Sequence, residues 1–182
     1  MQAPGITRYR RPFLAPLWVS LCGLVLVAAL AWAFYRSGPT TVIFLIRPVE
    51  AAPGTIDDPP LAPEGEARAS RLAQMFGVSG GVDAIYETRD RRSAQTAAPL
   101  AERLHRAPVV FASDDAATVA ARALREHSGG TLLVVGTGAA LAQMVRQLTG
   151  AAPPAAVPDE SDLLYVVSVP RFGRAHLVRL RI

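Results

Sequence analysis

Three segments of this sequence combine residue types that could bind an anion. Arg47 directly follows the β-branched and apolar run 41–46, and Arg92 lies in a polar segment that reads Arg-Arg-Ser-Ala-Gln-Thr-Ala. The third segment, Gly-Thr-Gly at 136–138, follows the apolar run 131–135. Guanidinium groups bind phosphate and carboxylate oxygens through two parallel hydrogen bonds, and the free N–H groups at a helix start also attract anions. These segments predict an anion site if the fold brings them together.

The elements that would position these segments alternate between strand and helix patterns. Apolar runs predict strands at 41–46, 82–86, 109–111 and 131–135. Helical spacing predicts helices that begin near Pro63, at 91–104, from Asp114-Asp115 to about Glu126, and at 138–148. The runs 163–169 and 176–182 predict a closing antiparallel pair. We therefore expect an α/β domain whose sheet is mainly parallel and flanked by helices, with ligands bound at the carboxyl ends of the strands.

The N-terminal region has a different character. Pro12 to Tyr35 is a run without any charged residue. As a helix this run would be about 36 Å long, enough to cross a hydrocarbon core of about 30 Å. A cleavable signal peptide is the alternative, because Ala31-Trp32-Ala33 has the small-x-small form of a cleavage site. Its apolar region would normally be only about 7–15 residues, so we expect an uncleaved transmembrane helix.

The distribution of arginine predicts how this helix would be oriented. Arg8, Arg10 and Arg11 precede the apolar run and Arg36 follows it, which predicts a cytoplasmic N-terminus and an exported, periplasmic or extracytoplasmic domain. From residue 41 onward the arginines and the acidic residues balance, so the chain offers no support for nucleic-acid binding. The only cysteine, Cys22, lies in the apolar run, which excludes an intramolecular disulfide.

Four regions follow from these patterns. Residues 1–11 are a cytoplasmic tail, 12–35 a single transmembrane helix, 36–40 a linker and 41–182 the folded domain.

In order and spacing, the motifs of the folded domain resemble the histidine phosphatase superfamily, which has the phosphoglycerate mutase-like fold. That family has Arg-His after its first strand, Arg-x-x-Gln-Thr-Ala at the start of a helix, and Gly-His after a later strand. The resemblance implies that Arg47 and Arg92 are phosphate-binding residues. Pro48 and Thr137 occupy the positions of the two catalytic histidines. The resemblance therefore implies a catalytically degenerate member that retains the scaffold without its nucleophile.

Neither replacement can do the chemistry of a histidine. The nitrogen of Pro48 is locked in an amide and offers no lone pair, and Thr137 has a hydroxyl suited to a helix N-cap. The three histidines, His105, His127 and His176, are expected at helix ends or on an edge strand, away from the carboxyl ends of the central strands. We expect no metal site and no cofactor, because no Cys, His or carboxylate spacing suggests one.

Three functions are compatible with this sequence. The first is a membrane-anchored pseudoenzyme that acts as a binding or scaffolding module for a protein partner, or for phosphate or a phosphorylated ligand. The second is an active phosphohydrolase with an unusual nucleophile such as Glu50 or Asp57. The third is a structural subunit of an envelope membrane complex. If the arginine pocket holds no external anion, we expect an internal carboxylate, Glu50 or Glu87, to lie between the two guanidinium groups.

Overall fold

The protein is described by a computed structural model that covers residues 15–36, 38–49, 57–78, 81–152 and 163–181. The chain divides into two compact units, Met1–Gly38 and Pro39–Ile182. Each unit is described by itself below.

The first unit contains one helix, α1 (Ala15–Arg36). Its side chains at 18–34 are all exposed, including Trp18, Leu24 and Phe34. A helix was predicted here, but residues 12–14 of the predicted segment lie outside the described residues. Within the described ranges, no helix is both long and apolar enough to cross a membrane. The transmembrane helix predicted over 12–35 is therefore not confirmed. Pro16 lies in the first turn of α1, where its missing N–H is tolerated, and the leucine- and alanine-rich residues that follow favour a helix.

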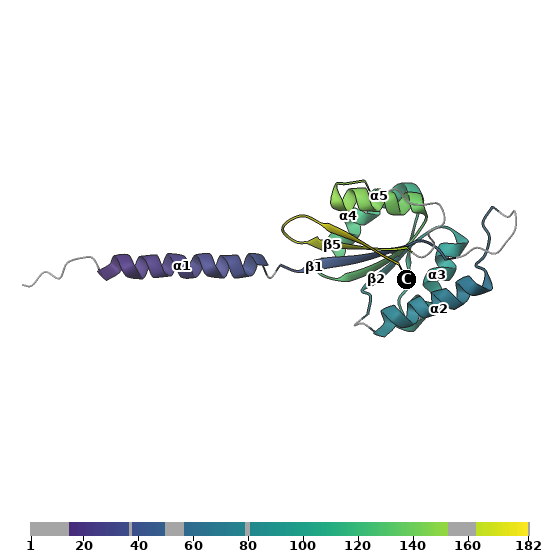
Figure 1. The fold of residues 1–182 in the computed structure, drawn as a ribbon, viewed down its shortest axis with the longest axis horizontal. Coiled ribbons are helices and arrows are strands. Elements are labelled where there is room, and N and C mark those ends of the chain that lie inside the picture. Colours follow the sequence, from purple (N-terminus) through teal and green to yellow (C-terminus); the bar gives the residue numbers. More distant parts are fainter. Residues whose placement is uncertain (1–14, 37, 50–56, 79–80, 153–162, 182) are drawn as a thin grey trace, which may run out of the picture. The chain divides into compact units, whose positions relative to one another are not determined.

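The second unit is built on one six-stranded sheet, in the order β3-β2-β4-β1-β5-β6 (Figure 1). The strands are β1 (Thr40–Ile46), β2 (Ala84–Thr88), β3 (Val109–Phe111), β4 (Thr131–Val135), β5 (Leu163–Pro170) and β6 (His176–Arg181). The first four strands of this order are parallel to one another, and β5 and β6 add an antiparallel hairpin beside β1. The sheet is thus mixed, with the parallel portion and the closing antiparallel pair that the sequence predicted.

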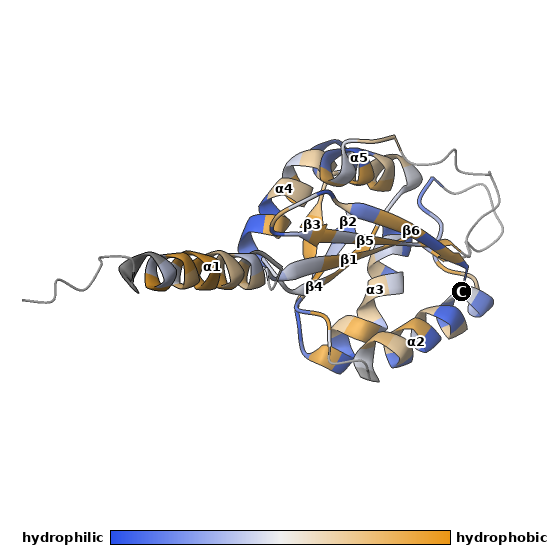
Figure 2. Cartoon of the chain, turned by 60° about the vertical axis from the view of Figure 1, so that its left-hand side comes forward, coloured by the Kyte–Doolittle hydropathy of each residue, from blue (hydrophilic) through white to orange (hydrophobic). Residues whose placement is uncertain are grey.

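Helices cover both faces of this sheet (Figure 1). They are α2 (Pro63–Val78), α3 (Arg91–Leu104), α4 (Ala116–Glu126) and α5 (Gly138–Thr149), and a short 3₁₀ helix, η1 (Ser113–Asp115), precedes α4. In Figure 2 the strands are mainly hydrophobic, whereas hydrophilic residues recur along the outer side of α2. This pattern is typical of a sheet buried between two helical layers.

Alternation along each strand divides the interior into two hydrophobic cores. Ile43 and Leu45 of β1 point into the core beneath α4 and α5. Ile46 of β1 and Ile85 of β2 point into the core beneath α2 and α3. Because successive side chains of a strand face opposite sides, the same short strands supply both cores.

Two boundaries differ from the sequence predictions. The strand predicted at 82–86 is shifted to Ala84–Thr88, because Glu87 and Thr88 continue the ladder with β3. The N-cap of α4 is Asp115, but its side chain makes no capping hydrogen bond, and the preceding turn is 3₁₀. Asp114-Asp115 therefore does not begin α4 as a side-chain cap.

Candidate functional site at the carboxyl ends of the parallel strands

Arg47 and the glycine-rich segment meet where β1 and β4 end. Ile46 pairs with Val135 in the parallel ladder, and the backbone N–H of Gly136 donates to the carbonyl of Ile46 at 3.1 Å. The guanidinium of Arg47 lies over the start of α5: a Cβ atom on Gly138 would be 3.7 Å from both its Cζ and its Nε. The sheet register therefore places a cation beside the first residue of α5.

Thr137 is the N-cap of α5, with an extended backbone (φ −60°, ψ 152°). Its hydroxyl accepts a hydrogen bond from the N–H of Ala140 at 3.4 Å, which confirms the capping role considered from the sequence. The same hydroxyl lies 3.3 Å from the Oγ of Ser113, in η1. Sequence reasoning missed Ser113, and its only signal was its position after the short strand 109–111.

Arg92 is the second residue of α3, and a polar cluster fixes the start of this helix. The Asp90 carboxylate accepts from the N–H of Ser93 at 2.9 Å and from the Thr88 hydroxyl. The hydroxyls of Thr88 and Ser93 are 2.9 Å apart and both residues are buried. An Asp N-cap within such a network sets the position of the first turn, and hence of Arg92.

Gln95 and Thr96, which belong to the Arg-x-x-Gln-Thr motif, form hydrogen bonds that link the neighbouring loops to α3. Gln95 accepts a hydrogen bond from the N–H of Leu61 at 2.8 Å. Thr96 donates to the carbonyl of Arg92 at 2.7 Å and accepts from the N–H of Val49 at 3.4 Å. The chain that follows Arg47 is thus attached to the helix that carries Arg92. These two polar residues serve a structural role at the edge where both arginines lie.

Arg47 and Arg92 are both half-buried and follow strands β1 and β2, which flank β4. Among the described residues, no ion pair or side-chain hydrogen bond involves either guanidinium group. Their positive charge is therefore not neutralised by a neighbouring carboxylate of the described chain. Such an arrangement can bind an anion at the helix start, where backbone N–H groups and the hydroxyls of Thr137 and Ser113 add donors.

Among the described residues, Glu87 forms no ion pair with Arg47 or Arg92. It is buried, with 7% of its surface exposed, and its Oε2 has no hydrogen-bond partner. Burial raises the pKa of this carboxyl above its ordinary value, and the nearby Asp90 carboxylate raises it further. No hydrogen bond or ion pair among the described residues joins Glu87 to Arg47 or Arg92, so the expectation that it lies between the two guanidinium groups is not confirmed. On β2 it shares a face with Ile85, toward the core beneath α2 and α3.

The remaining candidates lie elsewhere. Pro48 follows Arg47 and is half-buried, Asp57 is exposed, and Glu50 lies outside the described residues. His105 is the C-cap of α3 and His127 that of α4, so both precede the amino ends of strands. His176 begins β6, opposite Ser168. As predicted, none of the three histidines is at the carboxyl ends of the parallel strands.

No group of three or more His, Cys, Asp or Glu side chains within the described ranges could hold a metal ion.

Comparisons with known proteins agree with this architecture. Residues 47–114 match the family model of the histidine phosphatase superfamily (branch 1). No curated protein matches the chain in sequence. Three similar solved structures are all phosphatases.

The protein histidine phosphatase SixA, complexed with tungstate, has a TM-score of 0.62 and 18% identity, and the alignment covers 77% of this chain and 96% of that chain. A mycobacterial glucosyl-3-phosphoglycerate phosphatase has a TM-score of 0.59 and 13% identity, with coverages of 76% and 97%. The phosphoserine phosphatase of Entamoeba histolytica, in complex with 3-phosphoglyceric acid, has a TM-score of 0.57 and 16% identity, with coverages of 78% and 97%.

At these identities the structural likeness establishes the fold, and the sequence match covers the segment that carries both arginines. The chain thus has the α/β fold of the histidine phosphatases, and its residues 47–114 are similar in sequence to that superfamily.

Proposed function

We propose that this protein is a non-catalytic histidine-phosphatase-like module that binds a partner through a domain whose catalytic centre has been lost. The partner is a protein or a phosphorylated ligand. Two features support this proposal. The strand end after Arg47 has no histidine, and Arg47 and Arg92 lie at the same edge of the sheet, which we call the cationic edge.

The observation that carries the proposal is the pair of residues at the two histidine positions. Pro48 has no ring nitrogen free to attack phosphorus. Thr137 is occupied as the N-cap of α5, and its hydroxyl supplies no positive charge. The histidines of the chain lie at the other ends of their elements, so no imidazole is available at this edge to take up a phosphoryl group.

The cationic edge supports residual anion binding. Arg47 lies beside the N-terminus of α5, and neither Arg47 nor Arg92 is paired with a described carboxylate. Phosphoryl groups bind to such arrangements of guanidinium groups and helix N–H donors without any chemistry. We propose that this edge binds phosphate, or a phosphorylated group of a partner, weakly.

A phosphatase assay tests the proposal directly. The purified protein should not release phosphate from p-nitrophenyl phosphate above a blank without protein. Turnover that disappears in an Arg47→Ala variant would contradict the proposal and would favour the second function considered above, a hydrolase with an unusual nucleophile. A protein partner is tested separately, by co-purification from mild detergent.

The cellular location is a proposal of its own. The apolar run at 12–35 and the arginines that flank it support a membrane-attached protein with a cytoplasmic N-terminus and an exported domain. Reporter fusions after Ile182 test this. Activity of a reporter that works only in the cytoplasm would contradict it.

A further inference from the structure

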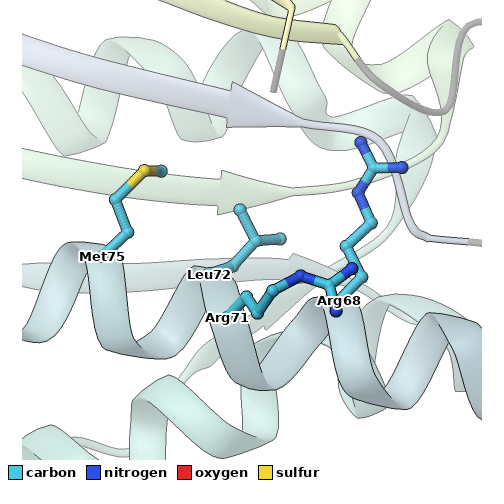
Figure 3. Close-up of a pocket in the computed structure, with 4 residues that line it drawn as sticks. All are labelled: Arg68, Arg71, Leu72 and Met75. Carbon is cyan, nitrogen blue, oxygen red and sulfur yellow. The ribbon is translucent and has the colours of Figure 1, made fainter.

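A groove runs beside α2, on the face of the sheet that α2 and α3 cover. One of its two cavities, of about 430 Å³, is lined mainly by apolar side chains, among them Val42, Phe44, Phe76, Leu164 and Leu180. The other, of about 400 Å³, is lined by Arg68, Arg71, Leu72 and Met75 (Figure 3). Met75 lines both cavities, so they are neighbours along the helix. We call the two together the α2 groove.

The apolar part of the α2 groove is a surface that the helices leave open. The rings of Phe44 and Phe76 pack edge-to-face with their centroids 4.9 Å apart and link β1 to α2. Next to them, Leu180 of β6 is 45% exposed and Met75 is 44% exposed. Large apolar side chains that gather in one exposed hollow are typical of a binding site rather than of ordinary surface.

The charged residues of the α2 groove, Arg68 and Arg71, lie at the end nearer the N-terminus of α2. Arg68 and Arg71 precede Leu72, Met75 and Phe76 along α2, and Figure 3 shows Arg68, Leu72 and Met75 extending from the helix toward the strands. From Arg68 to Phe76 the helix rises about 12 Å at 1.5 Å per residue. No acidic side chain is among the described residues that line either cavity. An occupant that complements this lining has a negative head and an apolar tail.

A third cavity, of about 430 Å³, is also lined by charged side chains, but these form hydrogen bonds within the protein and do not indicate a ligand. Asp83 and Arg106 line it, but the Asp83 carboxylate accepts from the N–H of Thr131 at 2.7 Å. The Arg106 guanidinium donates to the carbonyl of Asp83 at 2.8 Å. The polar groups of that cavity hold the loops together, whereas no hydrogen bond between described residues uses the guanidinium of Arg71.

We propose that the α2 groove binds a single-chain anionic amphiphile of the fatty-acid class. The carboxylate is held at the Arg68–Arg71 end, where a guanidinium fork matches its two oxygens. The acyl chain lies over Leu72 and Met75 and enters the apolar cavity, where its burial supplies most of the affinity. This site is independent of the cationic edge at the strand ends and of whether that edge still binds phosphate.

The methionines provide a site-specific measurement in the full chain. Met75 lies in the groove, whereas Met144 is 1% exposed in the core beneath α4 and α5. With methyl-¹³C methionine, a titration with sodium dodecanoate below its micelle concentration should shift the Met75 methyl signal to saturation. The Met144 signal should not move, and it therefore also reports that the fold is intact. Binding of the amphiphile to α1 would leave both signals unchanged.

Charge and apolar contacts are then tested separately. Arg71→Gln should weaken dodecanoate binding roughly two- to fivefold, the size of one exposed ion pair. Arg125→Gln, an exposed arginine on α4, is the matched control and should have no effect. Leu180→Asn should weaken binding through the tail. Dodecyltrimethylammonium, with the same tail and a positive head, should bind more weakly than dodecanoate.

Two results would overturn this assignment. One is a Met75 signal that does not saturate with dodecanoate while Met144 shows a folded protein. The other is equal binding of the cationic and anionic amphiphiles, which would leave an apolar peptide segment as the better occupant of the groove.

Discussion

The guanidinium of Arg47 lies against Gly138, the first residue of α5, so that a Cβ atom on this glycine would meet its Cζ and Nε at 3.7 Å. That distance is an ordinary van der Waals contact. Two residues earlier, the space is much tighter: a Cβ atom on Gly136 would lie 3.0 Å from the Cγ2 of Thr88. Of the two glycines that flank Thr137, only Gly136 lies too close to a neighbour to accept a side chain without a shift.

This difference predicts opposite effects for the same substitution. Gly138→Ala should keep the fold and raise the free energy of unfolding by up to about 1 kcal/mol, because alanine restricts the unfolded chain. Gly136→Ala should lower it by roughly 1–3 kcal/mol, because the buried β4–β2 contact is overpacked. Urea denaturation of the two variants measures both. Equal stabilities would show that the space at Gly136 opens without cost.

Phosphate binding should depend on Arg47. We expect calorimetric titration of the protein with inorganic phosphate to give a dissociation constant in the millimolar range, about −4 kcal/mol. Arg47→Ala should abolish the signal, because it removes the cation at the start of α5. Arg125→Ala, on the exposed side of α4, is the control and should bind as the unsubstituted protein does. If the Arg47→Ala protein binds phosphate with unchanged affinity, the phosphate does not bind at the edge that carries Arg47.

Restoring both histidines should not restore an efficient phosphatase. In the double variant Pro48→His/Thr137→His, we expect at most weak turnover of p-nitrophenyl phosphate. The loss of the Thr137 cap costs about 1 kcal/mol of stability, and replacing Pro48 removes the restriction that its ring places on the backbone after Arg47. The two single variants serve as controls and should be inactive. Vigorous activity of the double variant would show that only these two residues separate the protein from catalysis.

Glu87 should make the stability of the protein depend on pH. Burial, and to a lesser extent the Asp90 carboxylate, raises its pKa in the folded state above the ordinary value of 4.5, so the folded state holds this proton more tightly than the unfolded chain. The free energy of unfolding should therefore fall as the pH rises from about 4.5 through the folded-state pKa, and then level off. Glu87→Gln should remove this component and raise the melting temperature at pH 7.

The control for this variant is Glu102→Gln, which alters an exposed carboxylate on α3 and should leave the melting temperature nearly unchanged. A Glu87→Gln protein that melts at a lower temperature at pH 7 than the unsubstituted protein would show that the ionised carboxylate has a stabilising partner.

The Asp90 cap should determine the stability of α3. Asp90→Ala removes the acceptor for the N–H of Ser93 and for the Thr88 hydroxyl, and should cost roughly 1–2 kcal/mol in the free energy of unfolding. Asp90→Asn keeps an N-cap side chain and should cost much less. If asparagine is as destabilising as alanine, the charge of Asp90 rather than its hydrogen bonds stabilises the helix start.

The sequence by itself determined the order and type of the elements, because periodicity and chain breaks are local. The alternation of short apolar runs and helical patterns predicted the parallel strands and the closing hairpin, and all of these elements are present. That no histidine follows Arg47 or Gly136 could also be read directly, and a proline nitrogen cannot act as a nucleophile in any fold. The position of Thr137 as the N-cap of α5 followed from its place between a strand and a helix.

Only the tertiary structure decided which side chains meet. The shift of β2 to Ala84–Thr88 came from ladder pairs with β3 and β4, which are distant in the sequence. The same register places Glu87 beside Val135, on the face that also carries Ile85, because side chains alternate along a strand. Ser113 reaches Thr137 across 24 residues, and the α2 groove joins residues from α2, β1, β4, β5 and β6. Such contacts depend on the sheet order, which no local pattern in the sequence encodes.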